Sequence, residues 1–374
     1  MAICTPIRVE PQSAPAELVQ EAASLLVGGR RVGVLAGTGV HRSGAGRQLT
    51  QLVETLGIPV LTTANGKGAI AEDHRLSLGM FGGEHDFPPG GLDDPRIAFI
   101  NSLDVLLVVG SSLSHFRVKS QGLEQPDHLI HVDIDTWSID KWYQTSVSLV
   151  GDAGTILTQL NDKVAGRTPQ LEPGFADRVG QVRQAIADYK QRAMPNETRT
   201  MEAIRRVVPR DTIFVGDVAV CVHRGSNYCL PIYADRTYIT PAWGGLGFGL
   251  PAAAGAKAAC PDRPVICLTG DGGFQFNIQE LGTCAQYGLH PIVLVFNDNA
   301  WGVIRYFQKT KMGGRTMASE LPSPDFAKLA EAYGVAGVRV ATLEALVDAL
   351  QSAPSSGRMT VIDVATPEGF AAFA

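Results

Sequence analysis

Short apolar runs alternate with amphipathic stretches along the first 165 residues of the chain. The runs are rich in β-branched residues and apolar on both sides, which is typical of strands that are covered on both faces of a sheet. The stretches between them, such as 18–26 and 44–57, repeat apolar residues every three or four positions, the spacing of one helix face. This alternation predicts a parallel sheet with strands at 31–37, 59–63, 104–110, 128–135 and 146–152.

A second series of the same kind follows residue 200. Its predicted strands are 211–217, 237–240, 264–271, 291–298 and 360–366, and its predicted helices are 250–260, 277–288, 325–334 and 343–353. Between the two series, residues 166–200 are polar and contain three prolines, as expected of a connection. The sequence therefore predicts an α/β protein with two doubly wound parallel-sheet domains, 1–165 and 201–374, joined by a linker at 166–200.

The composition fits two folded domains and excludes several classes of protein. Of the 374 residues, 45% are hydrophobic and 18% are charged, which is too apolar for a disordered chain. The net charge of −5 predicts no basic face, so we expect no nucleic-acid partner. The six cysteines form no CxxC pair and several stand in apolar runs, which favours reduced thiols over disulfides or a zinc site.

The sequence also lacks the features of a membrane protein or a secreted protein. No apolar run reaches the roughly 18 residues that a membrane-spanning helix needs. The first 17 residues contain no long apolar stretch of the kind found in signal peptides. We therefore expect a cytoplasmic protein that does not act at a membrane.

The strongest chemical signal lies at the ends of two successive predicted strands. The motif GDG at 270–272 ends one strand and the motif NDN at 297–299 ends the next, with 24 residues, enough for one helix, between them. Because ligands bind at the carboxyl ends of parallel strands, we expect Asp271 and Asp298 to lie side by side there. Two carboxylates and a backbone carbonyl leave Mg²⁺ with open positions for phosphate oxygens.

The surroundings of these motifs fit a diphosphate. Gly270, Gly272 and Gly273 let the backbone approach an anion closely, and we expect a helix N-terminus near residues 276–277 to direct its dipole at that anion. Alone, GDG would be better explained as an ordinary strand-to-helix turn, and NDN as an ordinary Asx-rich turn. Their occurrence on successive strands favours a metal–diphosphate site.

Three segments resemble one enzyme family. Residues 270–305 resemble the cofactor motif of thiamine-diphosphate enzymes, with GDG, a helix and an asparagine-rich turn. Residues 240–274 are similar to the same stretch of acetolactate synthase-like members, and residues 32–79 are similar to their central domain. The resemblance implies a 2-keto acid decarboxylase or carboligase that uses thiamine diphosphate and Mg²⁺, with a small 2-keto acid and a carbonyl acceptor as substrates.

The resemblance also implies roles for individual residues. Asp271 and Asp298 would bind Mg²⁺ through their side chains and Ala300 through its carbonyl, although members usually carry asparagine where this chain has Asp298. Leu246 would hold the cofactor in its bent shape and the Gly244 carbonyl would accept from the aminopyrimidine, so these two are the expected catalytic residues. The further residues expected to touch the cofactor are Val218, Ala219, Gly270, Gly272, Gly273, Asn299 and Trp301.

Other positions near these motifs leave two interpretations open. Trp301, Ile304 and Arg305 follow the metal turn and either face the substrate or pack the next helix. Val220 and Cys221 stand where acetolactate synthase-like members often carry polar residues, which puts their usual substrate in doubt.

Members of this class usually begin with a pyrimidine-binding domain, whose glutamate hydrogen-bonds the cofactor ring and activates it. This sequence opens almost directly into the central-domain similarity. We therefore expect either that another polypeptide supplies the glutamate or that the sequence is a fragment of a longer chain. The first alternative is favoured, as a separate pyrimidine-binding subunit in a heterotetramer with two copies of each chain. Glu84 lies in a superficially similar motif, but inside the central domain, and is not favoured for this role.

Two other functions remain as alternatives. One is a non-catalytic regulatory or scaffold subunit that has kept the fold, against which the intact GDG and NDN motifs argue. The other is a nucleotide-dependent oxidoreductase that uses the glycine-rich loop 37–46, which lacks a full GxGxxG. The same loop would be the place for FAD or ADP in the central domain, the less favoured cofactors. Asp133 and Asp135 are interpreted as turn formers.

Overall fold

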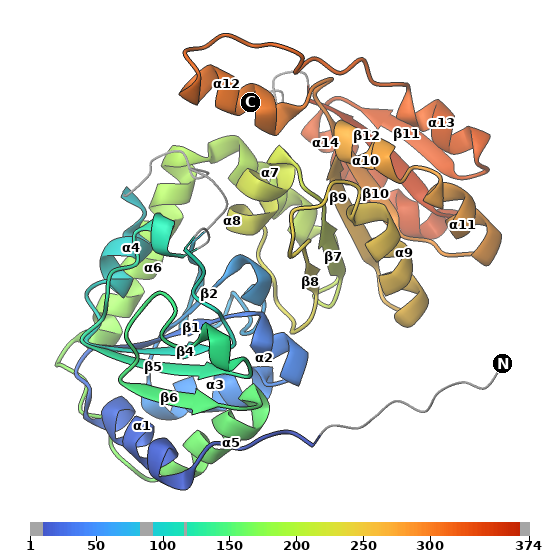
Figure 1. Ribbon diagram of the computed structural model, residues 1–374. Helices are drawn as coiled ribbons and strands as arrows, with labels where there is room; N and C mark the ends of the chain where they lie inside the picture. The colour runs from blue at the N-terminus through green and yellow to red at the C-terminus, as the bar shows by residue number, and fades with distance from the viewer. Residues whose placement is uncertain (1–9, 83–92, 116–117, 367–374) are drawn as a thin grey trace. The chain divides into compact units, whose positions relative to one another are not determined.

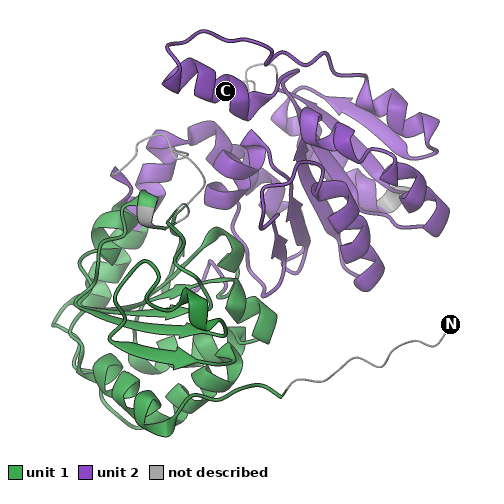
Figure 2. Ribbon diagram, viewed as in Figure 1, with its two compact units in different colours: residues 1–70, 75–82, 95–183 green, residues 71–74, 83–94, 184–374 purple. Residues whose placement is uncertain are grey.

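The computed structural model describes residues 10–82, 93–115 and 118–366. The chain divides into two compact units, which are coloured separately in Figure 2. Unit 1 takes in residues 1–70, 75–82 and 95–183, and unit 2 takes in residues 71–74, 83–94 and 184–374. Each unit contains one six-stranded sheet whose strand pairings are parallel. The predicted fold class is confirmed.

The sheet of unit 1 has the strand order β3-β2-β1-β4-β5-β6 (Figure 1). The first strand, β1, is therefore central, with β2 and β3 added on one side of it and β4, β5 and β6 on the other. Its strands are β1 (Val32–Ala36), β2 (Val60–Thr62), β3 (Ser77–Met80), β4 (Val105–Val109), β5 (His128–Asp133) and β6 (Val147–Val150). Its helices are α1 (Ala16–Gly28), α2 (Thr38–Ser43), α3 (Gly46–Leu56), α4 (Pro95–Ile100) and α5 (Ala153–Val164), with short turns η1 (Ala64–Gly66), η3 (Lys119–Gln121) and η4 (Thr136–Ser138). Helix α6 (Phe175–Ala193) begins in unit 1 and ends in unit 2.

Burial on both faces explains why the central strands of unit 1 are apolar throughout. All five residues of β1 and all five of β4 are buried. Helix α3 buries Leu49, Leu52, Val53 and Leu56, which are spaced so that they share one helix face. It ends at Gly57, whose φ of 68° lies in the left-handed region that glycine adopts without strain.

The sheet of unit 2 has the order β11-β12-β10-β9-β7-β8. Its strands are β7 (Ile213–Gly216), β8 (Tyr238–Ile239), β9 (Val265–Gly270), β10 (Ile292–Asn297), β11 (Ala336–Val340) and β12 (Thr360–Ala365). Its helices are α7 (Pro195–Arg206), η5 (Cys221–Ser226, a π-helix), α8 (Asn227–Cys229), α9 (Gly249–Ala259), α10 (Asp271–Phe276), α11 (Glu280–Tyr287), α12 (Gly302–Lys311), α13 (Phe326–Ala332), α14 (Leu343–Ser352) and η6 (Ala353–Ser356). In the described part of the chain, no helix is long and apolar enough to cross a membrane.

The strand order of unit 2 brings three strand ends together. Strands β10, β9 and β7 are neighbours, in parallel register, so their carboxyl ends lie along one edge of the sheet. Each is followed directly by an aspartate, Asp217 after β7, Asp271 after β9 and Asp298 after β10. Three acidic side chains are thereby placed where parallel sheets bind ligands.

Two strands do not follow the expected apolar pattern and were not among those predicted. Strand β3 has only four residues, and Gly79 within it has a φ of 75°, which is not a strand conformation. Strand β11 is an edge strand with partly exposed residues, interrupted by Gly337. A Cβ at Gly337 would collide with the Ala327 carbonyl of α13, so close helix packing requires glycine there.

One predicted helix start is wrong. We expected the helix nearest to the GDG motif to begin near residues 276–277. Helix α10 instead begins at Asp271 itself, with Gly270 in extended conformation as its N-cap, and α11 begins only at Glu280. The GDG motif therefore forms the first turn of a helix.

Candidate functional site

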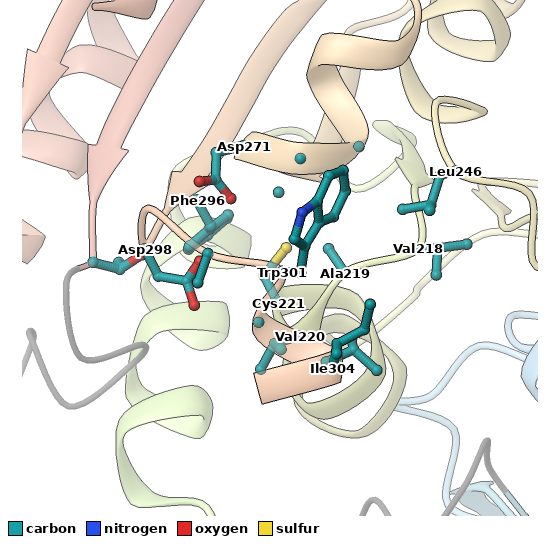
Figure 3. Close-up of a pocket in the computed structure, with 17 residues that line it drawn as sticks. Val218, Ala219, Val220, Cys221, Leu246, Asp271, Phe296, Asp298, Trp301 and Ile304 are labelled. Atoms are coloured by element: carbon teal, nitrogen blue, oxygen red, sulfur yellow. The ribbon is translucent and has the colours of Figure 1, made fainter. Parts of the chain in front are cut away.

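A cleft of about 180 Å³ opens at the carboxyl ends of β7, β9 and β10. Figure 3 shows Asp271 and Asp298 on one side of the Trp301 ring, and Val218 and Leu246 on the other. Apart from the two carboxylates, the wall is mostly apolar side chains and glycine backbone. The lining residues are Val218, Ala219, Val220, Cys221, Leu246, Gly270, Asp271, Gly272, Gly273, Phe296, Asp298, Ala300, Trp301, Gly302, Val303, Ile304 and Thr366.

The Asp271 carboxylate is buried and held by donors. Its side chain accepts a hydrogen bond of 2.7 Å from the Ser323 hydroxyl, and backbone N–H groups of Gly272 and Ala300 also donate to it. Burial raises the pKa of Asp271 above its usual value, and the hydrogen bonds from Ser323 and the backbone oppose that rise. Ser323 fixes this carboxylate from a loop that gave no signal in the sequence.

The Asp298 carboxylate lies close enough to Asp271 to feel its charge. Burial, and then repulsion from Asp271, raise the pKa of Asp298 to about 6, while Arg305 lowers it. Arg305 Nη2 donates to Asp298 Oδ2 at 2.8 Å. In the described residues no three His, Cys, Asp or Glu side chains form a metal cluster, so a cation here would rest on these two carboxylates and on backbone oxygen.

Hydrogen bonds fix the turn that carries Asp298. The buried Asn297 donates through Nδ2 to Asp363 Oδ1 on β12 at 3.1 Å, and its Oδ1 accepts from the Asn299 N–H at 3.2 Å. Asn299 has a φ of 52°, a left-handed conformation that asparagine tolerates better than most residues. The carbonyl of Asn299 accepts from the Leu321 N–H at 2.9 Å. The asparagines on either side of Asp298 therefore shape the turn rather than line the cleft.

Asp217 is a buried carboxylate that the sequence analysis did not select. It is 1% exposed, and four donors surround it. Oδ1 accepts from the N–H groups of Val218 and Gly247 at 2.7 and 3.1 Å, and Oδ2 accepts from the Gly249 N–H and the Thr269 hydroxyl at 3.1 and 3.2 Å. Asp217 thus ties the end of β7 to β9 and to the loop that carries Leu246.

Packing explains Gly272 of the GDG motif and Gly273, which follows the motif. A Cβ at Gly272 would lie 2.6 Å from the Trp301 ring, and one at Gly273 would lie 3.2 Å from Asp217 Oδ2. Trp301 also contacts Phe276, with ring centroids 6.1 Å apart in an edge arrangement. The Cα faces of both glycines therefore point at protein side chains, which is a reason for glycine that the sequence analysis did not consider.

The structure brings most of the predicted site residues into this cleft. Those that line it are Val218, Ala219, Leu246, Gly270, Asp271, Gly272, Gly273, Asp298, Ala300 and Trp301. Gly244 and Asn299 do not line it. Of the residues after the metal turn, Trp301 and Ile304 line the cleft, whereas Arg305 pairs with Asp298.

Unit 1 contains a second cleft of about 520 Å³ beside the loop 37–46. The N–H groups of Gly37 and Gly39 donate to the carbonyls of Val109 and Gly110 at 2.8 and 2.9 Å, so these two groups do not cradle a phosphate. The second cleft is lined by Thr38, Gly39, Arg42, Ser43, Thr63, Ala64, Asn65, Gly110, Ser111, Ser112, Ser114, Val118, Asp133, Ile134, Asp135, Ser138, Gly151, Asp152 and Ala153.

The other candidates of unit 1 have structural partners. Asp133 Oδ1 accepts from the Asp135 N–H at 2.9 Å, and Asp135 Oδ1 accepts from the Trp137 N–H at 3.0 Å, which confirms both as turn formers. Glu84 lies outside the described residues.

Two family models match the chain, and together they cover both units. The central domain of thiamine pyrophosphate enzymes matches residues 19–160, and the C-terminal thiamine pyrophosphate-binding domain of the same enzymes matches residues 217–364. The chain belongs to the thiamine pyrophosphate enzymes. Pyrophosphate and diphosphate are two names for the same group, so the resemblance of the sequence motifs to this family is confirmed. The C-terminal match contains Asp217, Asp271 and Asp298.

The curated relatives of this member of the thiamine pyrophosphate enzyme family include acetolactate synthases. It is 31% identical over 367 residues to the probable acetolactate synthase large subunit of Methanococcus aeolicus, covering 93% of this chain and 60% of that protein. It is 31% identical over 360 residues to the acetolactate synthase isozyme 3 large subunit of Escherichia coli, covering 92% and 61%. The chain spans about 60% of the length of these curated relatives.

Proposed function

We propose that this chain is the magnesium- and diphosphate-binding part of a thiamine-diphosphate-dependent 2-keto acid decarboxylase or carboligase. The observation that carries the proposal is the pair Asp271 and Asp298, which directly follow neighbouring parallel strands and line one cleft. Its acetolactate synthase relatives support carbon–carbon bond chemistry for the same site.

The donor set of the cleft fits a hard divalent cation. The carboxylate of Asp271 is buried and that of Asp298 is partly buried, and repulsion from Asp271 adds to burial in raising the pKa of Asp298. A divalent cation between them would relieve this repulsion, and oxygen ligands from carboxylates, carbonyl and phosphate are those that Mg²⁺ takes. Asp271, Asp298 and the Ala300 carbonyl would hold the metal, and the backbone of Val218 and Ala219 would contact the diphosphate.

When bound, thiamine diphosphate supplies the nucleophilic carbon and the electron sink for 2-keto acid chemistry. The residues of this chain would bind and orient the cofactor and exclude water from it. Leu246 would support the cofactor from the loop that Asp217 holds, and the φ of 64° at Gly244 sets the direction of that residue's carbonyl. Trp301 and Phe276 form the apolar cover over the GDG turn.

We further propose that another polypeptide completes the site with the activating glutamate, in a heterotetramer. Among the described residues, no glutamate lines the cleft. Its volume of about 180 Å³ also falls below the roughly 300–1,000 Å³ that is typical of whole ligand pockets. Both observations support a half-site that binds the diphosphate end of the cofactor.

The direct test is a calorimetric titration of thiamine diphosphate into the native chain with and without Mg²⁺, repeated with Asp271→Asn. We expect saturable binding with Mg²⁺, and binding at least roughly 100-fold weaker without Mg²⁺ or in the variant. Loss of a metal ligand should exceed the 10- to 100-fold effect of losing an outer partner such as Ser323. Asp271→Asn should still fold, because it removes a carboxylate whose burial is unfavourable.

Asp262→Asn is the matched control for the titration, since it makes the same charge change at an exposed position of unit 2. It should bind as the native chain does. Equal affinity with and without Mg²⁺ would contradict the proposed site. The scaffold alternative predicts no binding under any of these conditions, and the oxidoreductase alternative predicts binding of a nicotinamide nucleotide instead.

Leu246→Ala tests the role proposed for Leu246. Its side chain is 41% exposed at the cleft, so truncation should leave folding and Mg²⁺ binding nearly unchanged. We expect turnover to fall roughly 10- to 100-fold, because a misplaced reactive group loses about that much rate. Steady-state rates with a 2-keto acid and Mg²⁺ titrations measure the two effects separately. Val338→Ala, a partly exposed apolar residue on β11, is the control, and unchanged turnover in Leu246→Ala would refute the role.

A further inference from the structure

Asp298 brings to the proposed metal site one negative charge more than an asparagine would. Two carboxylates at one cleft attract a metal ion, but they also repel the diphosphate that must approach beside it. The structure places a counter-charge at this position, because Arg305 pairs with Asp298 at 2.8 Å. The side chains of Arg305 and Asp298 are only 18% and 16% exposed, so solvent screens their interaction weakly.

Local geometry fits the pair to one helix. Gly302 and Arg305 are three residues apart on α12, so they share one helix face. A Cβ at Gly302 would lie 2.8 Å from Asp298 Oδ2, so glycine leaves the space that the carboxylate occupies. Arg305 Nη1 also lies 3.8 Å from Glu320 Oε2, whose side chain is 75% exposed. The buried contact with Asp298 is therefore the closer and better shielded of the two.

We propose that Arg305 is a positioning residue that neutralises Asp298, so that the pair replaces a neutral oxygen ligand. This inference rests on the proposed magnesium–diphosphate function of the cleft. Asp271 and Asp298 together carry a net charge of −2, and Arg305 changes the net charge of the three side chains to −1. This equals the net charge of a site that has one aspartate and one asparagine. The guanidinium holds Oδ2 of Asp298, and one oxygen is all that a monodentate ligand contributes.

Charge compensation predicts opposite effects on the metal and on the anion. Without Arg305, the uncompensated carboxylate should attract Mg²⁺ at least as strongly as before and repel a diphosphate more strongly. A merely structural role for Arg305 would weaken the binding of both. This difference in sign separates the two explanations without any measurement of turnover.

The experiment titrates Mg²⁺ alone, and then inorganic diphosphate with Mg²⁺, into the native chain, Arg305→Met, Asp298→Asn and the double variant. Inorganic diphosphate is used because it needs only the half-site on this chain. We expect Arg305→Met to bind diphosphate roughly tenfold more weakly and Mg²⁺ no more weakly than the native chain. In the double variant, diphosphate affinity should return to within about threefold of the native value.

Two further variants control this experiment. Arg305→Lys should rescue most of the diphosphate affinity, because it keeps the positive charge. It also keeps the test possible if Arg305→Met does not fold. Lys309→Met removes the same charge from an exposed position of the same helix and should change nothing.

The outcomes are distinguishable. If the native chain binds diphosphate with Mg²⁺ and Arg305→Met binds it equally well, the inference is wrong and the proposed function stands. The inference is also wrong if the double variant binds as weakly as Arg305→Met, because Arg305 then acts on something other than Asp298. If the native chain binds no diphosphate with Mg²⁺, both the inference and the proposed function are overturned.

Discussion

Asp217→Ala is expected to destabilise unit 2 by about 4 kcal/mol or more and to free the loop that carries Leu246. The substitution leaves four donors buried without their acceptor, the N–H groups of Val218, Gly247 and Gly249 and the Thr269 hydroxyl. Each unsatisfied donor costs roughly 1–3 kcal/mol, and water entering the space left by the carboxylate recovers part of the sum. Such a loss is among the large effects of single substitutions.

Hydrogen exchange at the amides of Gly247 and Gly249 measures this effect directly, since both donate to Asp217. Their protection should fall in Asp217→Ala while protection in the strands of unit 1 stays the same. Thr269→Val removes one donor instead of the shared acceptor, so it should cost only about 1 kcal/mol. If both amides of Asp217→Ala stay protected and its denaturation midpoint is that of the native chain, Asp217 does not organise this site.

Asp217 also shows what the sequence could have revealed. It follows an apolar strand directly, as Asp271 and Asp298 do, so the signal that selected those two residues was present for it as well. Sequence alone could not show that β7 is the neighbour of β9 in the sheet, because strand order depends on tertiary packing. That order places Asp217 beside the GDG strand and makes it part of the same site.

Ser323 and the edge strand β11 could not be predicted from the sequence. Ser323 reaches Asp271 from a loop 52 residues further along the chain, and nothing in its local sequence distinguishes it from other loop serines. Strand β11 is exposed on part of its length, so its apolar pattern is incomplete. Elements with complete burial, such as β9 and β10, follow the predicted spans closely because their composition must be apolar throughout.

The position of the GDG motif was predicted from the sequence, but the packing of its glycine was not. The sequence located it correctly at a strand end and assigned its glycines to contact with an anion. In the structure Gly272 lies against Trp301, and Gly273 lies against Asp217, so internal packing already excludes larger residues at both positions. Internal packing is thus a further reason for glycine at these positions, and the expected approach of the backbone to an anion stays a prediction.

The chain alone is expected to convert a 2-keto acid roughly 10²- to 10⁴-fold more slowly than the complete enzyme, because we propose that the proton-transfer glutamate lies on another polypeptide. The tagged chain, purified from its native cells, should carry a companion of about one domain, roughly 150 residues, in equal amount. Mixing the two purified proteins should restore turnover, measured as 2-keto acid consumed.

A glutamate-to-glutamine series in the companion then identifies the activating residue, since one member of the series should abolish turnover while thiamine diphosphate still binds. Asp271→Asn in this chain should abolish both, which assigns the metal site and the activating glutamate to different polypeptides. Turnover by the purified chain without any companion would contradict this division, and the proton-transfer group would then have to lie on this chain. Turnover that requires the companion would therefore support the proposal that the cleft is one half of a site shared by two polypeptides.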